Sequence, residues 1–145
     1  MGIPSLGAKG LIVAASVGSN TPTADWSVHL SVMPSTPARA IAIFDTGGTG
    51  EGPNPKWLLD YRTIQVRVRG KPNDYQTIYA KIAQVKDVLL GLTAQTVEGD
   101  RWNGVTGLGD ITFLGRDQND QPELIMNFRI IMEPADNVLT NREVL

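Results

Sequence analysis

Two adjacent segments in the middle of the chain differ in the periodicity of their hydrophobic residues, and this difference restricts the fold more than any other feature. Residues 61–70 alternate between apolar and polar side chains, which is the period of a strand with one buried face. Residues 74–90 carry apolar side chains at helical spacing, namely Tyr75, Ile78, Tyr79, Ile82, Val85 and Leu89. A one-sided strand followed by a one-sided helix predicts a sheet that a helix covers.

Weaker patterns complete the predicted fold. Pro4 and Gly18 suit the start and the end of a short N-terminal helix. Asn73 is expected to cap the helix over 74–90, since its side chain can accept a free backbone N–H. Strands are predicted at 26–32, 40–44 and 97–102, and a hairpin is predicted from 110–114 and 124–133. The order predicts the α+β class: a mostly antiparallel sheet with one long amphipathic helix and a short N-terminal helix packed on one face.

The composition fits one globular domain over residues 1–145. Hydrophobic residues make up 41% and charged residues 19% of the 145 residues, so the core needs no disulfide or metal. A net charge of −2 argues against a general attraction to nucleic acid phosphates. The chain has no cysteine, which excludes thiol catalysis and Cys-ligated zinc. The apolar run at 11–17 is far shorter than the ~20 residues of a membrane span, so no membrane partner is expected.

The sequence Asp45-Thr46-Gly47 after an apolar strand is typical of the active-site turn of an aspartic protease. Residues 113–117, Phe-Leu-Gly-Arg-Asp, resemble the second signature of the retroviral branch of those enzymes. Such a protease needs two turns that share a proton and an almost all-β fold, whereas here a helix separates the two signatures. A homodimeric aspartic protease using Asp45 is the alternative; the favoured interpretation is that Asp45 accepts hydrogen bonds from loop N–H groups. Gly47 and Gly48 would then supply positive φ.

Other patterns for chemistry are incomplete. The only histidine, His29, lies on the polar side of a predicted strand, and no Gly-x-Ser-x-Gly elbow accompanies it. The glycines between 47 and 52 are not followed by the Lys-Ser/Thr of a phosphate loop. Residues 117–121 open like a calcium loop, but Pro122 and Phe128 occupy the positions that need Gly and Glu. No catalytic, cofactor-binding or metal-binding residue is therefore predicted, and the protein is not expected to be an enzyme.

The order and spacing of five segments carry a resemblance to a known family: residues 40–48, 60–70 and 86–92, Phe128-Arg129, and the segment after Pro134. The chain resembles minor capsid and tail terminator proteins of long-tailed bacteriophages. The resemblance begins near Trp26. It implies a small α+β domain whose subunits form a hexameric ring, without a cofactor. It implies a structural protein in the tail or neck of the virion, assembled in the host cytoplasm, that caps the tail tube. The implied partners are the tail tube protein and a head-completion or stopper protein; a head–tail connector stopper is itself an alternative.

Two sets of residues are candidates for assembly. Residues 46–56 form a long irregular stretch, and residues 134–145 are expected to form an extended C-terminal arm. The predicted subunit or partner contacts are Thr46, Gly47, Gly48, Glu51, Asn54, Lys56, Asp136, Asn137 and Arg142. Genomic DNA would pass through the ring without specific binding, and the polar sheet face predicted to line that lumen comprises Gln65, Arg67, Arg69, Asp110, Asn127 and Arg129. The competing interpretation is an intersubunit face where Arg67 and Arg69 pair with Asp60 or Glu123.

Overall fold

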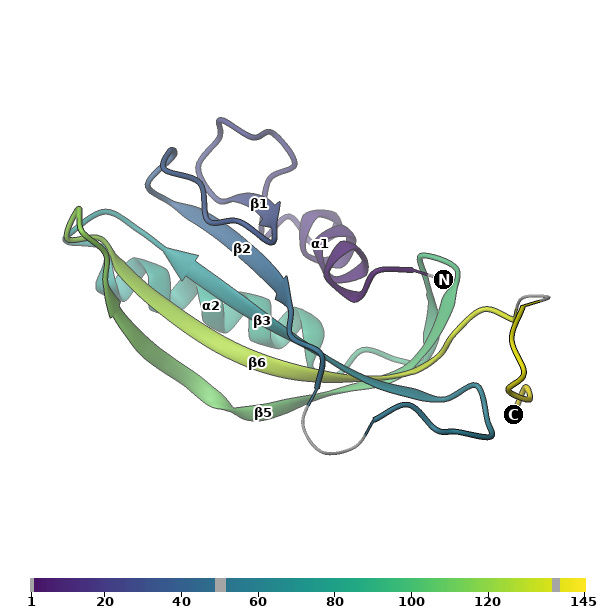
Figure 1. Ribbon diagram of the computed structural model, residues 1–145. Helices are drawn as coiled ribbons and strands as arrows, with labels where there is room; N and C mark the ends of the chain where they lie inside the picture. Colours follow the sequence, from purple (N-terminus) through teal and green to yellow (C-terminus); the bar gives the residue numbers. More distant parts are fainter. Residues whose placement is uncertain (1, 49–51, 137–138) are drawn as a thin grey trace.

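The computed structural model describes residues 2–48, 52–136 and 139–145, and within them two helices lie against one curled sheet (Figure 1). The helices are α1 (Pro4–Ala14) and α2 (Tyr75–Leu89). The strands are β1 (Ser27–Leu30), β2 (Ala40–Asp45), β3 (Asp60–Arg69), β4 (Gln95–Val97), β5 (Asp100–Arg116) and β6 (Pro122–Glu133). The predicted α+β class is therefore confirmed. None of the helices in the described ranges has the length and apolarity to cross a membrane.

The sheet is mixed and has the strand order β1-β2-β3-β6-β5-β4. β1 pairs with β2 in parallel, and the other four ladders are antiparallel. β5 is much longer than the predicted strand over 110–114, and its ladder with β6 is interrupted after Trp102, Leu108 and Phe113. Such bulges increase the local twist and bend a strand. The curl of β5 and β6 in Figure 1 follows from these interruptions.

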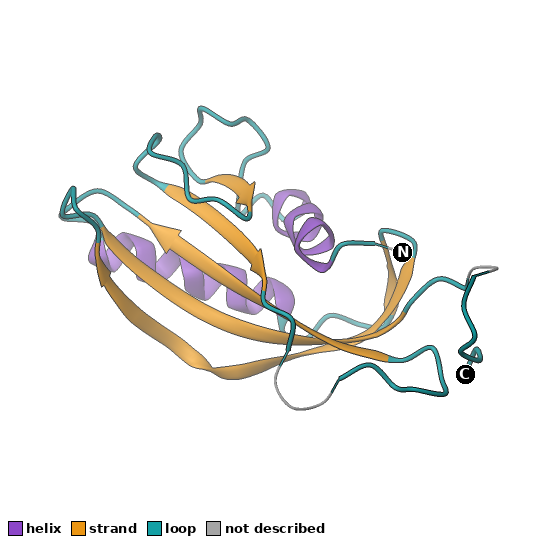
Figure 2. Ribbon diagram, in the orientation of Figure 1, coloured by secondary structure: helices purple, strands orange, loops and turns teal. Residues whose placement is uncertain are grey.

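Both helices cover the same face of the sheet, which holds the core. α1 contacts β1, β2 and β3, and α2 contacts β3, β5 and β6; Figure 2 shows α2 lying along the strands. Alternate residues of β6 are buried, as are those of the middle of β3. The largest fully buried side chains are Phe128, Ile12, Ile41, Ile43, Ile64, Ile78, Ile82, Leu89, Leu124, Met126, Ile130 and Met132. The one-sided strand and one-sided helix of the sequence therefore face each other.

A buried carboxylate at the start of β5 holds the residues just before α1. Asp100, which is fully buried, accepts hydrogen bonds from the backbone N–H of Gly2 at 2.6 Å and of Ala135 at 2.8 Å. Gly7 allows α1 to approach the side chains of Trp102 and Val97 closely. A Cβ at this position would lie only 2.8 Å from an atom of each. The glycine that weakens the helix in isolation is thus the residue that lets α1 pack on β4 and β5.

The start of α2 differs from the prediction that Asn73 caps it. The residue at the N-cap is Asp74, and its side chain makes no capping hydrogen bond to the helix. Its carboxylate instead accepts two hydrogen bonds from the Arg39 guanidinium, at 2.8 and 3.1 Å, and one from the Lys71 N–H at 2.9 Å. Asp74 is 8% exposed, so this pairing satisfies a nearly buried charge and joins the start of α2 to the loop before β2.

Ile82 is fully buried in the centre of the α2 face that meets the sheet. We predict that Ile82→Ala lowers the free energy of unfolding by about 2–5 kcal/mol, because it removes buried methyl groups and leaves a cavity. Urea unfolding followed by circular dichroism measures this difference. Gln84→Ala, on the exposed side of the same helix, is the matched control; equal midpoints for the two variants would contradict the assigned core.

The ion pair of Asp74 predicts a pH dependence of stability. The hydrogen bond from Arg39 lowers the pKa of the Asp74 carboxyl below its ordinary value. The ion pair therefore contributes its full stabilisation above about pH 4, the pKa of an aspartate in the unfolded chain. This stabilisation is lost as the pH falls through the pKa of Asp74 in the folded protein, which is lower. The stability difference between wild type and Asp74→Asn should shrink on acidification from about pH 5 to pH 2. The same comparison in an Arg39→Gln background should show little pH dependence; an unchanged slope there would contradict the role given to Arg39.

Candidate assembly surfaces

Asp45, the last residue of β2, binds the first turn of α1. Its carboxylate accepts hydrogen bonds from the Ser5 N–H at 3.0 Å and from the Ser5 hydroxyl at 2.6 Å. The helix has no side-chain cap from its own N-cap residue, Ile3. Asp45 therefore satisfies a free N–H of the first turn from another part of the fold, where a negative charge is also favourable.

The Asp-Thr-Gly sequence joins three elements through structural contacts. The sequence predicted loop N–H groups as donors to Asp45, whereas the donors among the described residues both belong to Ser5 of α1. Gly47 and Gly48 adopt positive φ, 79° and 100°, as predicted. Thr46 donates its N–H to the Thr63 carbonyl at 3.0 Å, and the two threonine hydroxyls lie 2.6 Å apart. This turn therefore fastens β2 to both β3 and α1.

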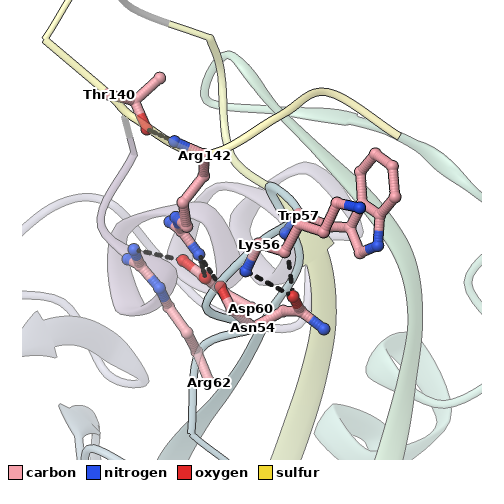
Figure 3. Close-up of polar contacts among 7 residues, drawn as sticks. All are labelled: Asn54, Lys56, Trp57, Asp60, Arg62, Thr140 and Arg142. Atoms are coloured by element: carbon pink, nitrogen blue, oxygen red, sulfur yellow. Dashed lines mark hydrogen bonds and ion pairs between the residues drawn. The ribbon is translucent and has the colours of Figure 1, made fainter.

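A second polar cluster joins the loop before β3 to the C-terminal segment (Figure 3). The Asn54 side-chain oxygen accepts the N–H groups of Lys56 and Trp57, both at 2.9 Å, and so closes a compact turn. The C-terminal segment lies along this turn. The Leu58 N–H donates to the Glu143 carbonyl and the Glu143 N–H donates to the Lys56 carbonyl, both at 2.7 Å.

Asp60, the first residue of β3, is the centre of this cluster. It is 2% exposed and accepts hydrogen bonds from Arg62 at 3.0 Å and from Arg142 at 2.7 Å. A buried carboxylate is tolerated when cations and donors surround it, and here two guanidinium groups do so. Arg142 also donates to the Asn54 carbonyl at 3.2 Å. The C-terminal segment is thus anchored at the start of β3.

The residues predicted to contact other subunits fall in separate places. Asn54, Lys56 and Arg142 meet in the cluster around Asp60. Thr46, Gly47 and Gly48 follow β2 at the other end of the same stretch, and the exposed Asp136 follows β6. Glu51 and Asn137 lie outside the described residues. Contacts within one chain bring the first group together, and the role of all these residues between chains stays a prediction.

Polar side chains of β3 and β6 meet on the face of the sheet opposite the helices. Gln65 lies opposite Asn127 in the ladder, and their amides are hydrogen-bonded at 3.2 Å. Arg67 donates to Gln65 at 2.8 Å and lies 4.7 Å above the Phe44 ring, while Arg129 lies 5.7 Å from the Tyr61 ring. We call these six residues the open face: Phe44, Tyr61, Gln65, Arg67, Asn127 and Arg129.

Two residues predicted on this polar face are placed differently. Arg69 is 4% exposed and donates to the Pro37 and Ala38 carbonyls at 2.8 and 3.0 Å, so it holds the loop before β2. Asp110 lies in the irregular part of β5 and accepts a hydrogen bond from Lys86 of α2 at 2.9 Å. This contact lowers the pKa of Asp110 and raises that of Lys86. The predicted set is therefore not one continuous surface.

The aromatic residues of the open face were missed by the sequence prediction, although strand parity contains the signal. Phe44 falls on the side of β2 opposite Ile41 and Ile43, and Tyr61 shares the parity of Gln65 in β3. A hollow of about 340 Å³ lies where this face meets the turn after β2; its lining residues are Thr46, Gly48, Thr63, Gln65, Leu108 and Asn127. In the described part of the chain, no three His, Asp or Glu side chains gather as a metal site requires.

Comparison with known proteins gives a family and a fold. Residues 5–134 match the family model described as bacteriophage tail terminator protein. A solved structure, titled virion of native gene transfer agent (GTA) particle, contains a chain with 17% identity and a TM-score of 0.66. The match covers 90% of this chain and 94% of that one, which establishes a shared fold. No curated protein sequence matches the chain.

The contact between Asp45 and Ser5 predicts a measurable loss of stability on truncation. We expect Asp45→Ala to lower the free energy of unfolding by about 0.5–2 kcal/mol, the range of a lost helix N-cap. Asp45→Asn should cost less, because its side-chain oxygen can still accept the Ser5 N–H. Urea unfolding measures both, with Asp87→Ala on the exposed side of α2 as the control. An Asp45→Ala midpoint equal to that of the control would contradict the capping role.

Proposed function

Because this chain belongs to the family of bacteriophage tail terminator proteins, we propose that it forms a closed ring that caps the finished tail tube and joins it to head-completion proteins. The family match over residues 5–134 carries the proposal, since it covers α1 from its second residue, α2 and all six strands. A tube of repeated subunits is most simply matched by a ring with cyclic symmetry, and six copies are proposed here. The ring would be part of the virion neck, assembled in the host cytoplasm.

The chain acts in this ring as one domain over residues 1–145, with residues 134–145 as a segment that contacts neighbours. The anchoring of Arg142 and Glu143 beside β3 supports a contact of defined position, because it fixes the direction in which the residues around them project. The turn after β2 lies beside the open face and is proposed as a second contact with a neighbouring subunit or the tube.

We assign the open face to the ring lumen. A lumen that lets DNA pass must avoid many simultaneous phosphate contacts, since each added cation raises affinity. Arg67 and Arg129 lie over aromatic rings, and Arg67 is also held by Gln65, so these contacts restrain their reach toward a phosphate. The competing intersubunit pairing is weakened by contacts within the chain: Arg69 is engaged by backbone carbonyls and Asp60 by two arginines.

The proposed role is structural and not enzymatic. The engagement of Asp45 with Ser5 at the start of α1 supports a structural function for the only Asp-Thr-Gly sequence in the chain. A stopper subunit, bound between terminator and head, is the second candidate. The two roles differ in what happens to the tail when the protein is missing.

Removal of the protein from phage production distinguishes these roles. A terminator is required to stop polymerisation, so its loss should give tails of abnormal and variable length in electron micrographs. Loss of a stopper should leave tails of normal length that fail to retain DNA-filled heads. Tails of normal length joined to full heads would refute both assignments.

The lumen assignment is tested by reversing the two charges of the open face. We predict that Arg67→Glu combined with Arg129→Glu leaves rings visible by electron microscopy but changes DNA retention or ejection, because like charges would then face phosphate. Lys9→Glu on α1, on the helix side of the sheet, serves as the control substitution. Loss of rings in the double variant, at unchanged melting temperature, would identify the face as an interface between subunits.

A further inference from the structure

Exposed apolar side chains occur as an aromatic patch at one end of β3 and along the C-terminal segment at the other end. Of the ten large hydrophobic residues exposed in the described part of the chain, six belong to these groups. The aromatic patch consists of Tyr75, Tyr79 and Phe113, which are 43–48% exposed. The C-terminal group consists of Leu139, Val144 and Leu145, which are 89%, 58% and 59% exposed. The three aromatic rings lie close to one another, unlike the single scattered apolar residues of an ordinary surface.

The aromatic patch is preorganised by contacts among its own rings. Tyr75 packs edge-on against Phe113 with ring centroids 5.8 Å apart, and lies 6.4 Å from Tyr79. Tyr75 belongs to α2 and Phe113 to β5, so the patch lies over the outer edge of the sheet. β4 pairs only with residues 100–102 of β5, and in the described ranges no other strand covers that edge beyond them. Rigid clustered aromatic side chains are typical anchors of protein interfaces.

The C-terminal group is held at the other end of β3. Arg142 binds the buried Asp60 at the first position of β3, and Glu143 bridges to Lys56 and Leu58. Tyr75 follows the last residue of the same strand by one short turn. The ten residues of β3 span about 33 Å, so this anchor keeps Val144 and Leu145 away from the aromatic patch of their own chain.

We propose that the aromatic patch of one copy binds the C-terminal group of the next copy. This inference rests on the proposed ring, which needs two different surfaces on each subunit because head-to-tail contacts generate cyclic symmetry. Both surfaces are apolar and exposed. The aromatic rings pack on one another, and the contacts of Arg142 and Glu143 position the chain just before Val144. The separation of the two surfaces along β3 prevents one copy from satisfying both. A second copy is therefore the occupant that fits both surfaces at once.

Cysteine crosslinking tests the contact directly, because the chain has no cysteine of its own. Full-length Phe113→Cys and Val144→Cys proteins are mixed under assembly conditions and oxidised with copper phenanthroline. The proposal expects a disulfide-linked dimer at several times the yield that either variant gives alone. Val32→Cys is the matched control, since Val32 is 54% exposed and belongs to neither group. Equal linking of Phe113→Cys to Val32→Cys, or dominant self-linking of Phe113→Cys, would overturn the proposal.

Charge insertion provides a second test with a different readout. Phe113→Asp and Val144→Asp should each reduce the yield of rings seen by electron microscopy by about tenfold or more, while Val32→Asp leaves it unchanged. If Phe113→Asp lowers the melting temperature, Tyr79→Asp tests the same patch from the exposed side of α2. Rings that persist in all patch variants would overturn this contact and leave the proposed ring intact. A wild-type protein that forms no ring, even on tails, would refute the proposed function as well.

Discussion

The hydrogen bonds between Asp45 and Ser5 determine where α1 lies, and the closure of the core depends on that position. α1 is not strongly amphipathic, its glycines weaken it, and it has no cap of its own. Asp45 supplies the cap from the end of β2, and Asp100 holds the N–H of Gly2 just before the helix. With its start fixed at two points, α1 packs against β1, β2 and β3 and contributes Ala8 and Ile12 to the core.

Local periodicity explains why the centre of the fold could be predicted. The alternation around Ile64 and the helical spacing around Ile82 each depend on neighbours within one element, so the sequence displays them directly. The partner of Asp45 is 40 residues away, and no local pattern points to Ser5. The length of β5 was missed for another reason. Gly104, Gly107 and Gly109 look like turn residues, yet they lie in the part of β5 that β4 does not pair with, where the ladder with β6 contains bulges.

The same distinction holds for the candidate surfaces. Parity along β3 and β6 predicted that Gln65 and Asn127 share a face, and the antiparallel register places them opposite each other. Strand parity alone does not show which arginine side chain is exposed on that face and which one is engaged by contacts within the chain. Arg69 is buried because the loop before β2 passes close enough to offer two carbonyls, and Asp110 is drawn to Lys86 at the sheet edge. Both outcomes depend on tertiary neighbours that are distant in sequence.

The anchor between Arg142 and Asp60 also has a mechanical consequence. A pull on residues 142–143 enters the fold at the first residue of β3, and the part of it directed along that strand loads the strand in shear. β3 is paired with β6 over its whole length and with β2 over its second half, so the ladder bonds on both sides bear the load together. Strands loaded in this shear geometry resist together, whereas a perpendicular pull would open the bonds one after another. A tension that the C-terminal segment transmits along β3 would therefore be resisted by the ladder bonds of both neighbouring strands at once.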